Sequence, residues 1–432
     1  MKKLKHLSFE ALVEVASSGF EQAEDGREAE KVKYPLRDVL MSGLAMMFFQ
    51  HRSLLQFQRA MEQRRGRSNL HQMFAVKVIP SDTQMRTVLD GVEPEVVRGV
   101  FKPVFERLRR GKQLERLKGI DGKYLVVVDG SQYFSSQTIQ CDGCLKKTHR
   151  GVTSYSHQIL PATLVCPGER LVIPIDAEEV RNEEGAEVQD CEQEAAKRLI
   201  KRLRQEHPRL KMVIGGDGLY SHEPMIELIE DLKIDYILVV QPGDHQELFD
   251  WVESLERAGA VASGQWMEEE MTYRYRIARE VPLTGQRQRW VNFFEVWVTN
   301  RAGRRVYHNS WVTPLQVQRQ TIREFVRGGR ARWKIENEQF NVQKNQGYEM
   351  EHNYGHGQRH LSFNFYLLNL LAFLWHQILE LTDRLFQQAR RRWGSRRHLW
   401  EHLRTVMDLW LVSSWWQMVQ MTVSDLPDAP AP

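Results

Sequence analysis

Short β-branched runs alternate with amphipathic helical stretches between residues 121 and 243, and no other feature limits the fold as much. The runs that end at Asp129 and Asp217 are short and apolar, which is typical of buried strands. A 3.6-residue apolar period marks the helices between them. The order predicts an α/β domain with a mixed sheet, whose second and third strands pair as a meander. The predicted elements are strands 124–130, 154–168 and 170–180, helix 191–207, strand 211–218, helix 223–232 and strand 235–243.

Three acidic residues follow this pattern in an arrangement that suits metal binding. Asp129 and Asp217 each end a predicted strand, and Glu336 lies in a later stretch, RWKIENEQF, that reads as a helix. Hard divalent cations such as magnesium take carboxylate oxygens as ligands, and two-metal sites drive in-line displacement at phosphorus. Each acid alone also fits a turn or a solvated helix face, and Glu338 and Glu351 compete with Glu336. Their joint order predicts phosphodiester chemistry in an RNase H-like domain.

Composition agrees with a globular protein that contacts nucleic acid through local patches. Of 432 residues, 42% are hydrophobic and 27% are charged, and the net charge is only +4. Lysines and arginines gather in five clusters, among them residues 64–67, 327–334 and 389–398. One such cluster is usually a solvated helix face, but five together favour nucleic-acid binding.

The sequence argues against several other classes of protein. No secretory signal is recognisable, and the most apolar stretch contains Asn364, Asn369 and His376, which favours a buried helix over a membrane span. Four cysteines do not make a disulfide framework, so we expect a reducing cytoplasm. The sequence has neither the G-x-S-x-G elbow of serine hydrolases nor the G-x-x-x-x-G-K-[ST] loop of nucleotide hydrolases.

A likeness to a known family extends over most of residues 30–380. It is carried by the segments VVVDGSQYF and IGGDGLYSHEP and by residues 332–357. Through them the chain resembles bacterial insertion-sequence transposases of the DDE type, in the family-four-like group with a β-rich insert before the Glu. The resemblance implies that Asp129, Asp217 and Glu336 hold two Mg²⁺ ions, for which Mn²⁺ can substitute. It also implies cut-and-paste transposition, in which element ends are cleaved and the 3′-hydroxyl is transferred into target DNA. The implied partner is double-stranded DNA, bound by a homodimer in the bacterial cytoplasm and associated with the nucleoid.

The resemblance and the changes in periodicity divide the chain into five regions. A basic helical tail with exposed-looking aromatics closes it and is a candidate dimer contact. The regions are a helical N-terminal DNA-binding region (1–115), the first part of an RNase H-like catalytic domain (116–243), a β-rich insert (244–315), the second part of the catalytic domain with Glu336 (316–385) and the tail (386–432).

In this group of transposases a Tyr, an Arg, the Glu and a Lys recur on one helix. Arg332 precedes Glu336 by one helical turn and is either a phosphate clamp or a surface partner of that Glu. Gly329 stands where Tyr is expected, and Gln343 stands where Lys is expected, with Lys344 one step later. On a regular α-helix Lys344 is rotated by about 80° from Glu336. The predicted DNA contacts here are Arg330, Arg332 and Lys344.

Two tryptophans of the insert, Trp290 and Trp297, are further candidates for DNA contact. By the resemblance, aromatic residues of the insert stack on a base that is flipped out of the DNA, and stacking on an extruded base has a general rationale. The alternative interpretation is that both tryptophans pack in the core of the insert sheet.

Cys141 and Cys144 form a Cys-x2-Cys pair, which is half of a structural zinc motif. One interpretation is a zinc site completed by His149 and His157, and the other is two ordinary thiols in a loop. Further along, His352, His356 and His360 recur at steps of four. Glycines interrupt that stretch, so we expect a loop near the active site or DNA rather than a helix that binds metal.

Two rival functions remain open from the sequence. One is an RNase H-like DNA endonuclease that cuts without joining, and the other is an inactive, transposase-derived DNA-binding protein. An intact acidic triad favours an active enzyme over the second rival. The sequence does not separate the first rival from a transposase.

Overall fold

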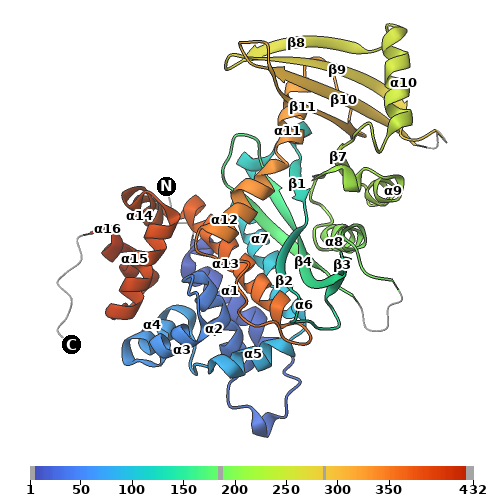
Figure 1. Cartoon of the computed structure of the whole chain (residues 1–432). Helices are drawn as coiled ribbons and strands as arrows, with labels where there is room; N and C mark the ends of the chain where they lie inside the picture. The colour runs from blue at the N-terminus through green and yellow to red at the C-terminus, as the bar shows by residue number, and fades with distance from the viewer. Residues whose placement is uncertain (1–4, 183–187, 286–288, 425–432) are drawn as a thin grey trace.

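The computed structural model describes residues 5–182, 188–285 and 289–424. One mixed sheet of eleven strands runs through these residues, and helices pack beside its central part (Figure 1). The buried apolar side chains form a continuous cluster that includes both ends of the described chain. The predicted α/β class is confirmed.

Five strands form the central part of the sheet. In spatial order they are β5 (Ile173–Val180), β4 (Val152–Val165), β1 (Tyr124–Val128), β6 (Met212–Gly216) and β7 (Asp235–Val239). β1, β6 and β7 run parallel, whereas β4 is antiparallel to both β1 and β5, as the predicted meander requires. Every residue of β1 and β6 is buried, which is why these strands read as unbroken apolar runs.

Two predicted helices and two unpredicted strands complete this central part. α8 (Glu192–Glu206) and α9 (Glu223–Asp231) lie to the right of the central strands in Figure 1 and join β5, β6 and β7 in the predicted order. The two strands are β2 (Ser131–Ser136) and β3 (Leu145–His149), which both pair with the first half of β4, one on each side of it. Most residues of these two strands are at least partly exposed, so they lack the apolar pattern of a buried strand.

The region between β7 and residue 315 is β-rich, as predicted, and it extends the same sheet. Its four antiparallel strands are β8 (Ala262–Glu268), β9 (Met271–Pro282), β10 (Trp290–Thr299) and β11 (Arg305–Thr313). β11 pairs with β7 through Trp311 and Val312, which joins the insert to the central strands. The insert begins with a helix that the sequence reading missed, α10 (Gln246–Arg257).

Helices from the two ends of the chain pack together on the left of the central strands (Figure 1). α13 (Leu361–Thr382) contacts α2 most extensively, and it also contacts α5 and α6. Within the described residues, α13 is the helix long and apolar enough to cross a membrane, but 83% of its most apolar window is buried inside the protein. The N-terminal helices are α1 (Phe9–Glu21), α2 (Leu36–Phe48), α3 (Leu54–Glu62), α4 (Arg64–Phe74), α5 (Asp82–Asp90), α6 (Pro94–Arg98) and α7 (Phe101–Arg110).

The C-terminal tail is helical, as predicted, but two of its aromatic side chains are not exposed. Trp400 and Trp415 are buried, and the ring of Trp415 stacks on that of Phe9, with centroids 4.8 Å apart. Trp416 is the exposed neighbour. The tail therefore completes the helical core, which the sequence reading did not anticipate. Its helices are α14 (Arg384–Trp393), α15 (Arg396–Leu409) and α16 (Trp415–Val423).

Candidate functional site

Asp129 and Asp217 lie side by side at the carboxyl ends of two neighbouring parallel strands. The register of β1 and β6 pairs Val127 with Gly215, so each aspartate stands two residues beyond the same pair. Adjacent strands are about 4.8 Å apart. Asp217 also accepts a hydrogen bond of 2.9 Å from the backbone N–H of Leu219, which fixes its carboxylate at the start of a short 3₁₀ turn.

Glu336 reaches this pair from a helical segment of the C-terminal third of the chain. The segment consists of α11 (Ile322–Arg330), a π-helical stretch (Ile335–Phe340) and α12 (Asn341–Asn345). Arg332 lies between the first two, 3.0 Å from the Oδ2 atom of Asp129 and 2.8 Å from the Oε1 atom of Glu336. One guanidinium thus joins the strand acid to the helix acid, and the three predicted acids form one cluster.

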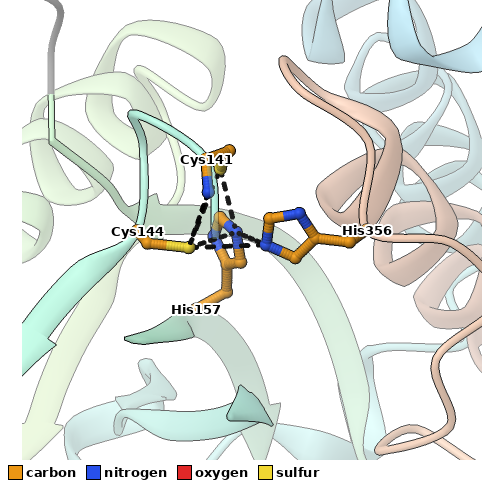
Figure 2. Close-up of side chains that lie close together, drawn as sticks. All are labelled: Cys141, Cys144, His157 and His356. Atoms are coloured by element: carbon orange, nitrogen blue, oxygen red, sulfur yellow. Dashed lines mark hydrogen bonds between the residues drawn. The ribbon is translucent and has the colours of Figure 1, made fainter. Parts of the chain in front are cut away.

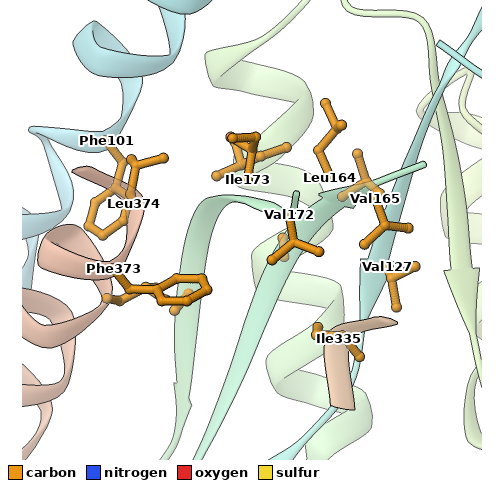
Figure 3. Packing of buried hydrophobic residues seen from close by; sticks show 14 of the residues in the cluster. Phe101, Val127, Leu164, Val165, Val172, Ile173, Ile335, Phe373 and Leu374 are labelled. Carbon is orange, nitrogen blue, oxygen red and sulfur yellow. The ribbon is translucent and has the colours of Figure 1, made fainter. Parts of the chain in front are cut away.

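Buried contacts on either side of Glu336 hold the π-helical stretch against the sheet. Ile335 is fully buried and lies near Val127 of β1 in Figure 3. Gln339 is fully buried too, and its side-chain oxygen accepts a hydrogen bond of 2.6 Å from the hydroxyl of Thr163 on β4. Glu336 lies between these two anchors, so its position relative to β1 is fixed by packing.

The π-helical stretch changes which residue of the next turn is accessible. The backbone N–H of Asn341 donates to the carbonyl of Glu336, five residues earlier, where an α-helix uses four. The extra residue in this turn reduces the rotation of every later residue by about 100° relative to a regular α-helix. Gln343 is consequently buried against Asn369, while Lys344 lies on the partly exposed side and pairs with Glu351 at 2.8 Å. The rotation predicted for Lys344 assumed a regular α-helix, and this stretch is not a regular α-helix.

Gly329 has a packing reason to stand where the resemblance predicts Tyr. A Cβ atom at this position would lie 2.6 Å from the ring of Trp311, which is fully buried on β11. The neighbouring Gly328 is equally restricted, because its Cβ would lie 2.2 Å from Ile120. The two glycines let α11 approach the sheet closely, and no tyrosine fits on this face.

The acid cluster carries more negative charge than its arginine balances. Burial raises the pKa of Asp129 to about 7 against the opposing effect of Arg332, and the nearby carboxylates of Glu336, Asp217 and Glu192 raise it further. Asp129 is largely buried, with 13% of its side chain exposed, whereas 35% of the Glu336 side chain is exposed. A site of this kind favours either a proton or an additional cation.

Glu192 is a fourth acid at this site, and it was not predicted from the sequence. It is the first residue of α8, and its Oε1 atom accepts a hydrogen bond of 2.5 Å from the hydroxyl of Tyr220. Burial raises the pKa of Glu192, although Tyr220 opposes the shift. Gly130 leaves room for the carboxylate, since a Cβ there would lie 2.1 Å from it. An acid in the first turn of a helix is common, so its position alone gave no signal.

The two acids that compete with Glu336 in the sequence face elsewhere. Glu351 pairs with Lys344. Glu338 lies near Arg396 of the C-terminal helices. The pKa of Arg396 is raised although burial opposes the shift, because the carboxylates of Glu380 and, more weakly, Glu338 lie close by. Of these three candidates, Glu336 alone contacts the arginine that binds Asp129.

The other predicted DNA contacts lie on or near the surface. Arg330 is exposed, and its guanidinium lies 4.7 Å from the ring centre of Tyr307. Trp290 is 50% exposed, and Trp297 is half-buried and stacks on His308. Neither tryptophan is a core residue, so the alternative interpretation of them was wrong. Another tryptophan, Trp333, was overlooked: it is 49% exposed and lies beside the guanidinium of Arg332.

The cysteine pair lies in a separate cluster with two histidines (Figure 2). Cys141, Cys144 and His157 are members, as one interpretation predicted, but the fourth member is His356. His149 is exposed on β3 and is not part of the group, which corrects the predicted ligand set. Spacing along the chain could not identify His356, because it lies 212 residues beyond Cys144.

Comparisons with known proteins leave the site to be interpreted from its own geometry. Neither the family models nor the curated proteins that were searched match this chain. The function of the chain is therefore inferred from the arrangement of the acids, the arginine and the strand ends.

Proposed function

We propose that this chain is a DNA transposase, which cleaves phosphodiester bonds at the ends of an element and joins the freed 3′-hydroxyl to target DNA. The observation that carries the proposal is the meeting of three acids from segments more than 80 and 100 residues apart: Arg332 joins Asp129 to Glu336, and Asp217 stands beside Asp129 on the neighbouring strand. Packing alone gives no reason to gather acids at one strand edge, because like charges repel.

The topology of the central strands supports the same proposal. The order β5-β4-β1-β6-β7, with β4 running opposite to the other four strands, is the arrangement expected of an RNase H-like domain. The acids stand at the ends of β1 and β6, where that fold is expected to carry its aspartates. The β-rich insert falls between Asp217 and Glu336, as in the transposases that the sequence resembles.

The donor set fits divalent magnesium. The acids of the cluster offer carboxylate oxygens, which hard cations prefer as ligands. The raised pKa of Asp129 reflects the negative charge of its neighbours, which a bound cation would neutralise. Asp129, Asp217 and Glu336 would hold the ions. When bound, such ions stabilise the entering and leaving oxygens of an in-line displacement at phosphorus.

The protein side chains around the acids would position the DNA. Arg332 sits within reach of both Asp129 and Glu336, so a phosphate brought to these acids would meet its guanidinium. Trp333 offers an exposed ring next to that arginine, which suits stacking on an unpaired base. Arg330 and Lys344 lie nearby in the chain and add positive charge for the DNA backbone.

The test uses the full-length chain, Mg²⁺ and DNA that carries the terminal inverted repeats flanking the reading frame. We expect cleavage followed by joining, and losses of at least about 100-fold in Asp129→Ala, Asp217→Ala and Glu336→Ala. Glu338→Ala is the matched control, since Glu338 lies two residues from Glu336 but faces Arg396, and it should keep its activity.

Each other outcome counts against the proposal in a specific way. Undiminished cleavage by the three alanine variants would place the chemistry elsewhere. Cleavage of the ends without any joined product would indicate a nuclease. Tight binding without cleavage in either Mg²⁺ or Mn²⁺ would indicate a DNA-binding protein that has lost its activity.

A further inference from the structure

Four potential metal ligands converge from three separate segments at the side of the sheet. Cys141 and Cys144 come from the turn between β2 and β3, His157 comes from β4, and His356 comes from the loop between α12 and α13 (Figure 2). Their four ligand atoms lie within 4.8 Å of one another. Cys141, Cys144 and His157 are buried, so this is an enclosed group rather than a surface coincidence.

The spacing between these atoms is that of a tetrahedral zinc site. Zinc–sulfur bonds of about 2.3 Å and zinc–nitrogen bonds of about 2.05 Å place the sulfurs about 3.8 Å apart, sulfur and nitrogen about 3.6 Å apart and the nitrogens about 3.3 Å apart. The two sulfurs lie 3.8 Å apart, and the two histidine Nε2 atoms lie 3.1 Å apart. Three of the four sulfur–nitrogen distances are 3.5, 3.5 and 3.4 Å, and the fourth, between Cys141 and His356, is within 4.8 Å.

The other ring nitrogen of each histidine is held in the way that a metal ligand requires. The Nδ1 atom of His356 donates to the carbonyl of Gly357 at 2.9 Å, and the Nδ1 atom of His157 lies 3.0 Å from the Glu179 carboxylate. With protons on both Nδ1 atoms, both Nε2 atoms present lone pairs to each other. Two lone pairs at 3.1 Å repel unless a cation lies between them.

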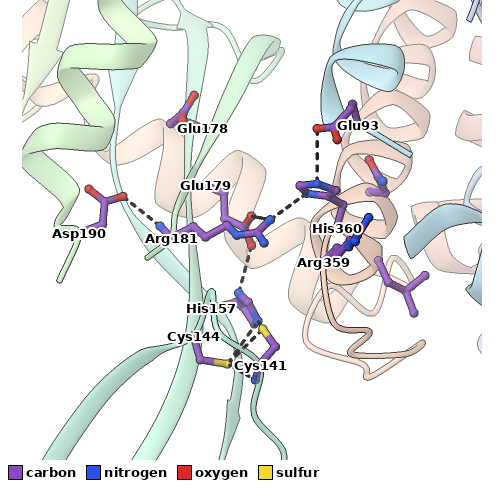
Figure 4. Close-up of polar contacts among 12 residues, drawn as sticks. Glu93, Cys141, Cys144, His157, Glu178, Glu179, Arg181, Asp190, Arg359 and His360 are labelled. Atoms are coloured by element: carbon purple, nitrogen blue, oxygen red, sulfur yellow. Dashed lines mark hydrogen bonds and ion pairs between the residues drawn. The ribbon is translucent and has the colours of Figure 1, made fainter. Parts of the chain in front are cut away.

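Glu179 is itself fixed, which gives the site a supporting layer. The hydroxyl of Tyr133 donates to Glu179 at 3.2 Å, and Arg181 lies on its other side (Figure 4). Arg181 also hydrogen-bonds His360 of the same loop that carries His356, at 2.8 Å. Carboxylates that orient metal-bound histidines are a regular part of zinc sites.

The cysteine pair has the geometry of a metal-binding turn and not that of a disulfide. The Sγ–Sγ distance of 3.8 Å is far longer than a disulfide bond of about 2.05 Å. The backbone N–H of Cys141 donates to the Cys144 sulfur at 3.4 Å, and Asn182 donates to the carbonyl of Cys144 at 2.8 Å. The turn is therefore held with both sulfurs on one side.

We infer that Cys141, Cys144, His157 and His356 bind one structural zinc ion. Four protein ligands close the coordination sphere, so the ion has no open position for catalysis. The ion fastens the loop of residues 346–360, which follows the helical segment that carries Glu336, to the β2–β3 turn and β4. The inference is independent of the proposed function, because it concerns none of the clustered acids.

The first test is the metal content of the untagged full-length protein, purified without chelator and measured by elemental mass spectrometry. We expect about one zinc per chain. After competition with a mild chelator, His356→Ala and His157→Ala should retain at least about tenfold less zinc than the wild type. His149→Ala and His352→Ala are the matched controls, and they should retain the ion.

A second test does not depend on how well the variants fold. Wild-type protein reconstituted with Co²⁺ should show the thiolate charge-transfer and intense ligand-field bands of tetrahedral cobalt. Absence of zinc and of these bands would overturn the assignment, as would iron in place of zinc. It would also be overturned if His149→Ala lost the ion while His356→Ala kept it, or if the native mass showed Cys141 and Cys144 joined by a disulfide.

Discussion

Asp129 is the residue whose negative charge is most strongly disfavoured by the acid cluster. In the absence of metal its pKa is raised to about 7 by burial and by its acidic neighbours, whereas an aspartate in an unfolded chain titrates near 3.9. The folded protein therefore binds a proton that the unfolded chain releases between about pH 4 and pH 7. Stability falls as the pH rises through this range, and the full cost is present above it.

Asp129→Asn should accordingly stabilise the metal-free protein at pH 8, by on the order of 1–3 kcal/mol, and change little near pH 4. Mg²⁺ should stabilise the wild type at pH 8 but not the variant. Thermal unfolding at the two pH values, with Mg²⁺ or with chelator, measures both effects. Asp121→Asn is the control, because Asp121 is exposed, at 69% of its side chain. A variant less stable than the wild type at pH 8 without metal would show that the carboxylate is favourably bound there.

Single residues also show where sequence reasoning succeeded and where it stopped. Asp129 and Asp217 were identifiable because each ends a buried strand. The resemblance selected Glu336 over Glu338, and the contact between Glu336 and Arg332 agrees with that choice. Glu192 gave no usable signal. His356 stood out in a series of histidines at steps of four, and it lies in a loop as predicted, but its partners Cys141, Cys144 and His157 are about 200 residues away in the chain and could not be identified from that series.

At the scale of elements, the π-helical stretch at Glu336 is the feature that no periodicity argument supplied. It places Glu336 between two buried anchors, Ile335 and Gln339, and brings Lys344 rather than Gln343 to the accessible side. Single π-helical turns frequently occur at functional sites. The strands and helices of the central domain were predictable from apolar runs, whereas the largely exposed strands β2 and β3 lacked an apolar pattern and were missed.

Deletion of Asn337, which is exposed within the π-helical stretch, should convert it into a regular α-helix. The N–H of Asn341 would then bond the carbonyl of Glu336 from four residues away, so the flanking turns keep their mutual rotation. Gln339 would stand one residue closer to Glu336 in the chain, so Glu336 and both anchors could not all keep their places. We expect a loss of at least about 100-fold in DNA cleavage, as for other small misplacements of catalytic groups. Asn337→Ala keeps the register and should retain activity; equal activity of the deletion would show that the π-helical turn is dispensable.

At the scale of the whole molecule, the two ends of the chain build one core. The N-terminal helices pack on α13, and the tail returns to them through Trp415. The sequence predicted a DNA-binding region at one end and a dimer contact at the other. Both assignments treat each segment of the chain by itself. Periodicity in the sequence does not show which segments, hundreds of residues apart, pack against each other.

Trp415→Ala should therefore destabilise the whole protein, by about 3–5 kcal/mol, because it removes a buried ring that stacks on Phe9. Trp416→Ala is the matched control; its side chain is 56% exposed, so a change within about 0.5 kcal/mol is expected. Equilibrium unfolding in denaturant measures both. Equal effects of the two substitutions, or a change in oligomeric state caused by Trp415→Ala alone, would contradict the placement of the tail in the core.

The packing of α2 against α13 also has a consequence for synthesis. α2 ends at Phe48, and the helix that covers it begins at Leu361. At about 5–20 residues per second, roughly 15–60 s separate the two on the ribosome. Throughout that interval the side of α2 that packs on α13, including Gly43 and Met47, lacks this native partner. The nascent chain is therefore expected to depend on chaperones until its last third emerges, and to be most open to proteases during the same interval.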